Sequence, residues 1–325
     1  MPHLHIENNS RASALSHIHQ PQVDAAAARH PALRALKVTI GWDEDILDEA
    51  LRSADYLISS RPPRENLKQR APKLRWIQTT GAGVDHLLPL DWLPADIVLT
   101  NNSGPHGPRC EDFCIMALLA LSQRLPRLMH QQREKRWDPI FTMPITGRMC
   151  VVIGYGDLGQ AAVRAAKRLG LSVIAVTRSG KGEGLADRVV ASTVLDEVLP
   201  EADFLIVTVP LTPQTRDIMS RRRLALLRPE TGIINVARAP LVNYEVLAEM
   251  LRDGRLSGAI LDVHEPEPLP PESYLWSVPN LMLTPHISCD DPRYVEMLLD
   301  AWAGNLARLD GGQGLRNVVD RLQGY

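Results

Sequence analysis

The run Met149-Cys-Val-Val-Ile153 leads directly into Gly154-Tyr155-Gly156-Asp157-Leu158-Gly159, and this stretch decides the fold. Its five apolar residues predict a buried strand, and residues 160–169 predict a helix behind the last glycine. In such a strand, turn and helix, Gly154 makes the tight turn, Gly156 lets the backbone approach a diphosphate and Gly159 allows close packing. The N-terminus of the helix offers amide donors to that anion. The stretch therefore predicts a dinucleotide-binding site.

Apolar runs alternate with helical patterns on both sides of this stretch. Six of them predict the strands of a doubly wound parallel sheet, at 149–153, 172–176, 204–208, 232–235, 259–261 and 281–283. Four shorter runs, at 37–41, 55–59, 74–78 and 96–100, predict a smaller parallel α/β unit. The sequence thus predicts an α/β protein with a Rossmann-type sheet and a second, smaller sheet.

Two helical segments connect these parts. Residues 109–135 predict one long helix that Pro126 kinks or splits, and residues 292–309 predict a helix that packs back on the first lobe. A chain of 325 residues is long enough for two domains. We expect residues 1–107 and 289–325 to form the substrate domain, and residues 108–288 to form the dinucleotide-binding domain.

The composition is that of an ordinary globular protein. Hydrophobic residues make up 45% of the chain, charged residues 23%, and the formal net charge is −2, which argues against nucleic acid as the main partner. The sequence has no apolar run of membrane-spanning length and no secretion signal, so we expect a cytoplasmic protein without a membrane partner. Four cysteines without regular spacing (Cys110, Cys114, Cys150 and Cys289) are typical of reduced, buried thiols.

Ten histidines are present, and five of them lie in the first 30 residues: His3, His5, His17, His19 and His30. Their spacing is loose, and no cysteine or acidic cluster accompanies them. A metal site needs a compact set of such ligands. We therefore expect these histidines to lie on a solvated surface, and we expect no metal site.

The strand after the glycine loop ends in Thr177-Arg178-Ser179-Gly180-Lys181. Enzymes that use NAD place an acidic residue near this point to bind the ribose 2′-hydroxyl. Thr177 stands there instead, and the cations of Arg178 and Lys181 together with the hydroxyl of Ser179 suit a 2′-phosphate. The run favours NADP(H) over NAD(H). The alternative is a solvated basic loop that discriminates poorly between the two.

Three further residues in separate strings suit hydride transfer to a carbonyl group. His286 titrates near neutrality and follows a strand, so it is the candidate proton donor. Glu267 can hold one ring nitrogen and stabilise the imidazolium. Arg238 can pair with a substrate carboxylate and polarise the adjacent carbonyl. Each residue alone also fits a structural role, but together behind a dinucleotide loop they predict a catalytic set.

With these residues in view, nearly the whole chain resembles the D-isomer-specific 2-hydroxyacid dehydrogenases. The matching strings are Thr80-Gly-Ala-Gly-Val-Asp85, the Gly154–Gly159 loop, Val209-Pro-Leu-Thr-Pro-Gln-Thr215, Ile234-Asn-Val-Ala-Arg238, Leu261-Asp-Val-His-Glu-Pro-Glu-Pro268 and Thr284-Pro-His286. The resemblance implies that Arg238, Glu267 and His286 are catalytic and that the backbone of Ala82 and Gly83 binds the substrate carboxylate. It also implies a flavodoxin-like substrate domain and a homodimer. Further cofactor contacts are implied for Tyr155, Asp157, Leu158, Val209, Pro210, Thr215, Val236, Ala237 and Asp262.

Several positions depart from the family pattern. Ala239 replaces the glycine that commonly follows the arginine, His264 replaces a common aromatic residue, and Ser288-Cys289-Asp290 replaces a glycine pair. The Thr-Arg-Ser run and the segment 319–325 resemble the NADPH-preferring glyoxylate/hydroxypyruvate reductase branch. That resemblance implies a reductase of small 2-keto acids.

Other functions remain open at this point. One alternative is an NAD-linked dehydrogenase of a bulkier 2-hydroxy acid, which only pocket residues of the first lobe would decide. Another is a dinucleotide-sensing binding protein without catalysis, although such a sensor has no need of an acid/base pair. A formate dehydrogenase is disfavoured, because that branch generally carries Gln rather than Glu ahead of its histidine.

Overall fold

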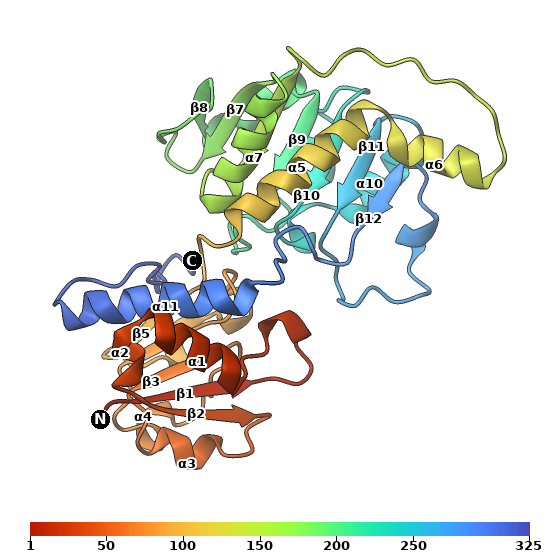
Figure 1. The fold of residues 1–325 in the computed structure, drawn as a ribbon. Helices are drawn as coiled ribbons and strands as arrows, with labels where there is room; N and C mark the ends of the chain where they lie inside the picture. Colours follow the sequence, from red (N-terminus) through yellow and green to blue (C-terminus); the bar gives the residue numbers. More distant parts are fainter. The chain divides into compact units, whose positions relative to one another are not determined.

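A computed structural model describes all 325 residues of the chain, which form two compact units. The first unit comprises residues 1–105 and 291–325, and the second comprises residues 106–290. Each unit is built on its own parallel β-sheet (Figure 1). None of the helices combines the length and apolar composition that crossing a membrane requires.

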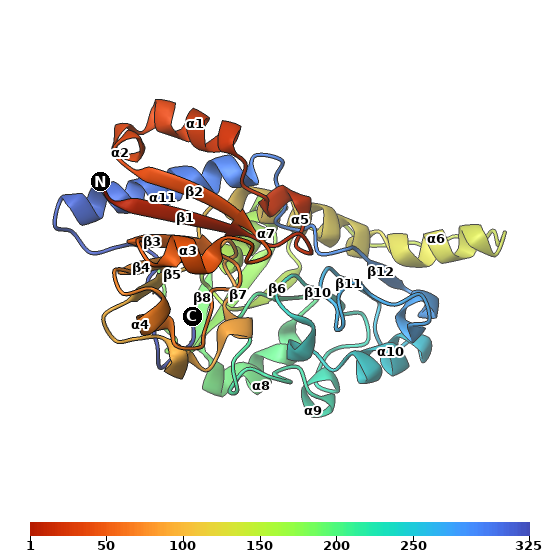
Figure 2. The same cartoon turned by 90° about the horizontal axis from the view of Figure 1, so that it is seen from below.

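The first unit contains a five-stranded sheet in the order β2-β1-β3-β4-β5, with all neighbouring strands parallel. Its strands are β1 (His3–Asn8), β2 (Lys37–Trp42), β3 (Tyr56–Ser59), β4 (Trp76–Gln78) and β5 (Val98–Thr100). Its helices are α1 (Gln20–Arg29), α2 (Pro31–Arg34), α3 (Leu47–Leu51), α4 (Leu67–Arg70) and α11 (Tyr294–Asp310). Helices α1 and α11 cover one face of the sheet, and α3 and α4 cover the other (Figures 1 and 2). The four predicted strands are confirmed.

Helix α11 completes the core of the first unit, as the sequence predicts. Val295, Leu298 and Trp302 are buried on one side of the helix. The ring of Trp302 stacks on that of Trp76 in β4, with 5.0 Å between centroids and an angle of 4° between the planes. Large aromatic side chains bury much apolar area, so the last helix of the chain contributes strongly to the stability of this unit.

The solvated surface expected for the first histidines is wrong for His3 and His5. Both lie in β1, an inner strand of the sheet, and are essentially buried. Nε2 of His5 donates to Glu7 at 2.9 Å, and both rings hydrogen-bond the Thr39 hydroxyl at 2.8 Å. Buried polar groups are tolerated when they are hydrogen-bonded, and this mutual pairing explains why polar residues occupy an inner strand.

The second unit contains a seven-stranded sheet in the order β12-β11-β10-β9-β6-β7-β8, again parallel throughout. Its strands are β6 (Met149–Ile153), β7 (Ser172–Thr177), β8 (Arg188–Ala191), β9 (Phe204–Val207), β10 (Gly232–Asn235), β11 (Gly258–Leu261) and β12 (Leu281–Leu283). The six predicted strands are confirmed. The sequence analysis missed β8, a short edge strand that begins with an exposed arginine.

Helices cover both faces of this sheet (Figure 1). They are α5 (Gly107–Ser122), α6 (Leu125–Arg133), α7 (Asp157–Arg168), α8 (Leu195–Val198), α9 (Arg221–Leu224) and α10 (Tyr244–Arg252). Cys150 and Val152 of β6 pack toward α5 and α7, whereas Val151 and Ile153 pack toward α8, α9 and α10. Burial on both faces is the reason why these strands read as continuous apolar runs.

The helix predicted for residues 109–135 is split rather than continuous. Helix α5 ends at Ser122, and α6 begins at Leu125 after Arg124, whose φ is +56°. Pro126 lies in the first turn of α6, where its missing amide hydrogen costs nothing. Residues 134–148 then leave the end of α6 as a long loop that returns to β6 (Figure 1).

Candidate active site

The glycine loop has the geometry that its sequence predicts. Gly154 has φ of +105°, and a side-chain carbon at Gly159 would lie 2.2 Å from the carbonyl oxygen of Gly154, so only glycine fits there. A side-chain carbon at Gly156 would meet nothing within 4 Å. Helix α7 begins at Asp157, three residues earlier than expected. Its first amides therefore stand beside open space at Gly156, which suits a diphosphate.

The basic loop after β7 is tied to the glycine loop through Tyr155. A side-chain carbon at Gly182 would lie 2.8 Å from the Tyr155 ring, and one at Gly184 would lie 2.3 Å from its hydroxyl. That hydroxyl accepts a hydrogen bond from the amide of Ala186 at 3.3 Å. The loop expected to bind the diphosphate and the loop expected to bind the ribose 2′-phosphate are thus packed against each other within one unit.

Thr177 and Ser179 shape the basic loop by local hydrogen bonds. The Thr177 hydroxyl donates to the carbonyl of Lys181 at 3.1 Å, and the Ser179 hydroxyl accepts from the Lys181 amide at 3.3 Å. The side chains of Arg178 and Lys181 are exposed. The loop therefore presents two cations to solvent just beyond the carboxyl end of β7, the edge at which doubly wound sheets bind their ligands.

A second turn lies at the carboxyl end of β9, where Val209, Pro210 and Thr215 are expected to contact the cofactor. The Thr215 hydroxyl donates to the carbonyl of Pro210 at 2.6 Å and accepts from the Thr212 amide at 2.8 Å. This side chain closes the turn on itself. Thr215 consequently fixes the shape of the segment around Val209 and Pro210, which is a structural contribution that the sequence did not reveal.

Two of the three candidate catalytic residues are in direct contact. Nδ1 of His286 donates to Oε2 of Glu267 at 2.8 Å, and Oε1 of Glu267 accepts from the His264 amide at 2.7 Å. The hydrogen bond from Glu267 raises the pKa of His286, although partial burial acts in the opposite direction. Burial works to raise the pKa of Glu267, but the bonds from His286 and His264 outweigh it and lower that pKa. The pair therefore favours an imidazolium beside a carboxylate.

Asp262 anchors the chain on the approach to His286. This fully buried carboxylate accepts hydrogen bonds from the Thr284 hydroxyl at 2.6 Å and from the amides of Ile287 and Ser288 at 2.9 and 2.8 Å. Three donors to one buried carboxylate hold the ends of β11 and β12 together. Asp262 thereby fixes the chain on both sides of His286, and one of the two amides is the backbone amide of Ser288.

Arg238 lies three residues beyond the end of β10 and is half-buried. Its Nη1 donates to the carbonyl of Ala237 at 2.7 Å, and its own carbonyl accepts from the Asn235 side chain at 2.9 Å. Ala239 begins a 3-10 turn with a backbone that needs no positive φ, so the methyl group at this position requires no strained conformation. Val236 and Ala237, which precede Arg238 in the sequence, are both buried.

Asn235 and Tyr244, which the sequence did not single out, link the backbone of Arg238 to that of Val263. The Tyr244 hydroxyl accepts from Asn235 and donates to the carbonyl of Val263, both at 2.9 Å. Burial raises the pKa of Tyr244, so it stays a neutral donor. Asn235 adjoins the predicted site and could have been noticed as a polar residue ending a buried strand. Tyr244 carries no such signal, because only the fold brings it there.

Ala82 and Gly83, the expected carboxylate-binding residues, lie in the first unit beyond the carboxyl end of β4. The carbonyl of Gly81 accepts from the Asn102 amide at 3.0 Å and from the Thr79 hydroxyl at 2.8 Å, and the carbonyl of Thr80 accepts from the Tyr294 hydroxyl. These bonds fix the loop through its carbonyl oxygens. The candidate substrate-binding and catalytic residues are thus divided between the units. Ala82 and Gly83 belong to the first unit, and Arg238, Glu267 and His286 belong to the second.

Residues 115–288 match the sequence profile of the D-isomer specific 2-hydroxyacid dehydrogenase, NAD binding domain. The chain belongs to the D-isomer specific 2-hydroxyacid dehydrogenase family. It is therefore an NAD(P)-dependent enzyme of that family, with the two-sheet α/β fold that the family shares. A dinucleotide sensor without catalysis is not the class to which the chain belongs.

Individual members of this 2-hydroxyacid dehydrogenase family resemble the chain over most of its length. A glyoxylate reductase from Thermococcus gammatolerans is 30% identical over 288 residues, which cover 85% of this chain and 86% of the relative. The structure of a family member from Xanthobacter autotrophicus Py2 in complex with NADPH and MES is 30% identical, with a TM-score of 0.86 and 99% coverage of both chains. The NADPH-dependent glyoxylate/hydroxypyruvate reductase from Sinorhizobium meliloti, in complex with NADP and sulfate, is 28% identical, with a TM-score of 0.82 and the same coverage.

Proposed function

We propose that this enzyme reduces a small 2-keto acid of the glyoxylate or hydroxypyruvate type to the D-2-hydroxy acid, with NADPH as the hydride donor. The observation that carries the proposal is the 2.8 Å hydrogen bond between His286 and Glu267. Because this bond raises the pKa of His286, the ring keeps its second proton to higher pH than an unpaired histidine does. A protonated imidazole can deliver the proton that a reduced carbonyl oxygen requires.

In this proposal each residue of the candidate site has its own role in the reaction. His286 donates its Nε2 proton to the developing alkoxide, while Glu267 stabilises the cation before transfer and orients the ring. Arg238 pairs with the substrate carboxylate and polarises the adjacent carbonyl. The backbone of Ala82 and Gly83 donates to the same carboxylate. Bound NADPH supplies the hydride, and the open space at Gly156 with the amides of α7 suits its diphosphate.

NADPH is proposed over NADH because of the loop after β7. Thr177 has no carboxylate that would repel a 2′-phosphate. Arg178 and Lys181 present two exposed cations beside the Ser179 hydroxyl. Cations and hydroxyls are the groups that bind phosphate oxygens most strongly. The relatives from X. autotrophicus and S. meliloti, whose structures hold NADPH and NADP, give independent support.

A small substrate is proposed on the strength of the relatives. The curated protein from T. gammatolerans is a glyoxylate reductase, and the S. meliloti relative is a glyoxylate/hydroxypyruvate reductase. The C-terminal segment that resembles this branch packs in the first unit, where the Val319 amide donates to the Leu99 carbonyl at 2.9 Å.

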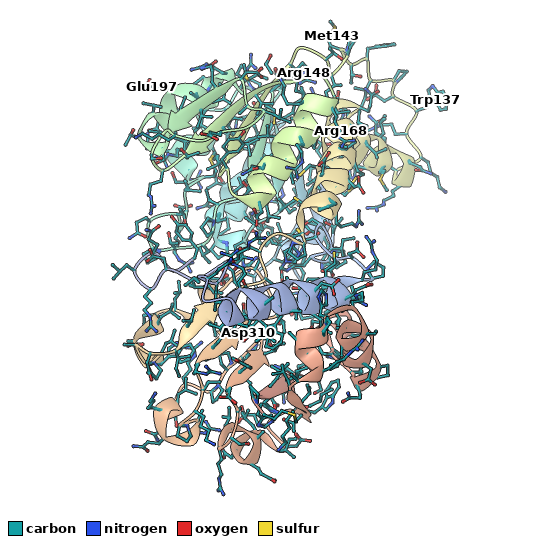
Figure 3. The ribbon with its side chains drawn as sticks, turned by 60° about the vertical axis from the view of Figure 1, so that its left-hand side comes forward. Trp137, Met143, Arg148, Arg168, Glu197 and Asp310 are labelled. Carbon is teal, nitrogen blue, oxygen red and sulfur yellow. The ribbon has the colours of Figure 1, made fainter.

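We further propose that the enzyme is a homodimer and that an arm formed by α6 and residues 134–148 is its interface. Trp137, Phe141 and Met143 on this arm are 96%, 95% and 76% exposed, and Figure 3 shows Trp137 and Met143 at the outer edge of the second unit. Monomers rarely expose large apolar side chains in a group. The arm also carries a hollow of about 520 Å³ between Leu128 and Pro139. A knob and a hollow on one surface suit a two-fold interface, in which each copy offers both.

Steady-state assays test the reductase. NADPH and NADH are each offered with glyoxylate, hydroxypyruvate and a bulky branched 2-keto acid, and the configuration of the product is determined. We expect turnover with NADPH and the small acids, D product, and a loss of roughly 10² to 10⁴ in kcat for His286→Asn. The exposed His19→Asn is the matched control. Turnover of the branched acid alone, or full activity of His286→Asn, contradicts the proposal.

A further inference from the structure

The ring of His264 makes a contact that an aromatic hydrocarbon at this position could not make. Its Nε2 lies 2.8 Å from the carbonyl oxygen of Thr284, two residues before His286. A carbonyl oxygen only accepts, so Nε2 carries the hydrogen. Nδ1 of the same ring is buried and has no hydrogen-bond partner. A hydrogen on Nδ1 would be unpaired, so the geometry places the ring hydrogen on Nε2, the nitrogen that meets the carbonyl.

The Thr284 carbonyl is shared with His286 itself. The His286 amide donates to the same oxygen at 3.0 Å, across Pro285. His286 has φ of +55°, a left-handed conformation that is unfavourable for a residue other than glycine. Surroundings must hold a residue in such a conformation. The His264 ring is one of the groups that fix the carbonyl around which this turn is built.

Hydrogen bonds link His264, Glu267, His286 and Thr284 in a closed ring. The His264 amide holds one oxygen of Glu267 at 2.7 Å, and the other oxygen holds the His286 ring at 2.8 Å. The His286 amide and the His264 ring then meet on the Thr284 carbonyl. His264 therefore takes part twice, through its backbone on the side of the glutamate and through its ring on the side of the histidine.

We infer that His264 is a positioning residue, whose ring holds the Thr284–His286 turn so that the His286 imidazole meets Glu267 and the substrate in one orientation. The inference rests on the proposed function, because it takes His286 as the proton donor. Replacing the ring leaves the amide of residue 264 in place, so a substitution isolates the ring contact. The side chains of Arg238, Asp262 and Asp290 also act electrostatically on His286, and none of them is altered by such a substitution.

A pair of substitutions separates hydrogen bonding from bulk. His264→Phe keeps an aromatic ring but removes the donor, whereas His264→Gln keeps an amide hydrogen at nearly the reach of Nε2. For His264→Phe we expect kcat to fall on the order of tenfold, equivalent to about 1.4 kcal/mol, while KM for NADPH stays within about twofold. The alkaline limb of the pH–rate profile should move to lower pH. His264→Gln should recover most of kcat and of the profile.

The pKa of His286, measured by NMR titration of the unliganded protein, gives a readout that does not depend on turnover. It should fall in His264→Phe and return in His264→Gln. His264→Asn, whose amide is too short to reach the carbonyl, should behave like His264→Phe and replaces it if that variant does not fold. Equal kcat, pH profile and His286 pKa in wild type and His264→Phe would overturn the inference. Equal impairment of His264→Phe and His264→Gln would also overturn it, because bulk rather than donation would then matter.

The two proposals fail in different ways. An inactive wild-type enzyme with every 2-keto acid contradicts the proposed function, and the NMR titration still decides whether the His264 ring controls the state of His286. An active wild-type enzyme with an unaltered His264→Phe variant contradicts only the role of His264.

Discussion

Glu267 holds His286 by Nδ1, at a distance of 2.8 Å, and thereby leaves Nε2 as the ring nitrogen directed away from the carboxylate. The two residues are 19 positions apart, one between Pro266 and Pro268 in a loop and the other beyond strand β12. Their contact raises the pKa of His286 and so favours the protonated ring.

Glu267→Gln should lower activity by about 10²-fold, because the neutral amide neither stabilises the imidazolium nor fixes its orientation. Reduction needs protonated His286, so the rate falls as pH rises through its pKa. Glu267 raises that pKa, and its loss should move the alkaline limb of the pH–kcat profile to lower pH. The exposed neighbour Glu265→Gln serves as the control. A limb that stays in place would show that Glu267 does not set the protonation of His286.

Gly159→Ala and Gly156→Ala should have separate effects. The methyl group at residue 159 would lie 2.2 Å from the Gly154 carbonyl, so thermal denaturation should reveal a loss of about 1–3 kcal/mol. The methyl group at residue 156 meets nothing within 4 Å, so that variant should keep the wild-type Tm. It should instead raise KM for NADPH on the order of tenfold, because a diphosphate has to approach the backbone there. An unchanged KM for Gly156→Ala would show that the dinucleotide does not bind at this loop.

Thr177→Asp should reverse the preference for the phosphorylated cofactor. The new carboxylate repels a 2′-phosphate and accepts from a 2′-hydroxyl, so kcat/KM for NADPH should fall on the order of tenfold or more and that for NADH should rise. Thr193→Asp makes the same chemical change at an exposed position of the same unit. Comparing both cofactors at low ionic strength, and again at high salt, checks that charge is the cause. Parallel losses with both cofactors would argue against a 2′-phosphate site.

Trp137→Ser combined with Phe141→Ser should convert a dimer into a monomer in sedimentation velocity experiments. Both side chains are almost fully exposed on the arm, and apolar burial would be the main source of affinity there. Leu322→Ser removes an equally exposed apolar side chain from the first unit and should leave the mass unchanged. A wild-type protein that sediments as a monomer at micromolar concentration contradicts the homodimer.

His3 should make the protein less stable in acid. Burial lowers the pKa of His3, with Lys37 and His5 acting in the same direction and Asp55 opposing them. The unfolded chain then takes up a proton below about pH 6.5 that the folded chain does not, so the free energy of unfolding falls as pH drops below that value. Tm measured between pH 8 and pH 5 should show this decline, with a smaller slope in His3→Gln. His19→Gln, an exposed histidine of the same segment, should keep the wild-type slope.

The sequence predicts most of this fold, because strands buried on both faces are apolar throughout, as in β6 and β9. The pattern fails at β1, where His3, His5 and Glu7 alternate with apolar residues. An alternating strand reads as half solvated, and only the tertiary structure brings Thr39 of β2 to satisfy the histidines. Strand β8 is missed for a related reason, since an edge strand with few apolar contacts resembles a loop.

The candidate site is predicted unevenly. Glu267 and His286 stand in recognisable strings, and the structure brings the two together. The contributions of His264, Tyr244 and Thr215 are not visible in sequence, because each acts by hydrogen-bonding a backbone carbonyl. Carbonyls are present at every residue and carry no sequence signal. The identity of a reacting group can therefore be read from the chain more easily than the groups that hold it.

The stacking of Trp302 on Trp76 has a consequence for biosynthesis. During synthesis, β1 to β5 leave the ribosome first. Helix α11 follows only after all 185 residues of the second unit, from His106 to Asp290, have been made. Until then the sheet face around Leu4, Ile6 and Trp76 has no cover from α11. Nascent chains with exposed apolar sheet faces are prone to aggregation and are the usual clients of chaperones. The second unit can finish folding while the first is still waiting for its last helix, so the order of synthesis is the reverse of the order in which the two cores close.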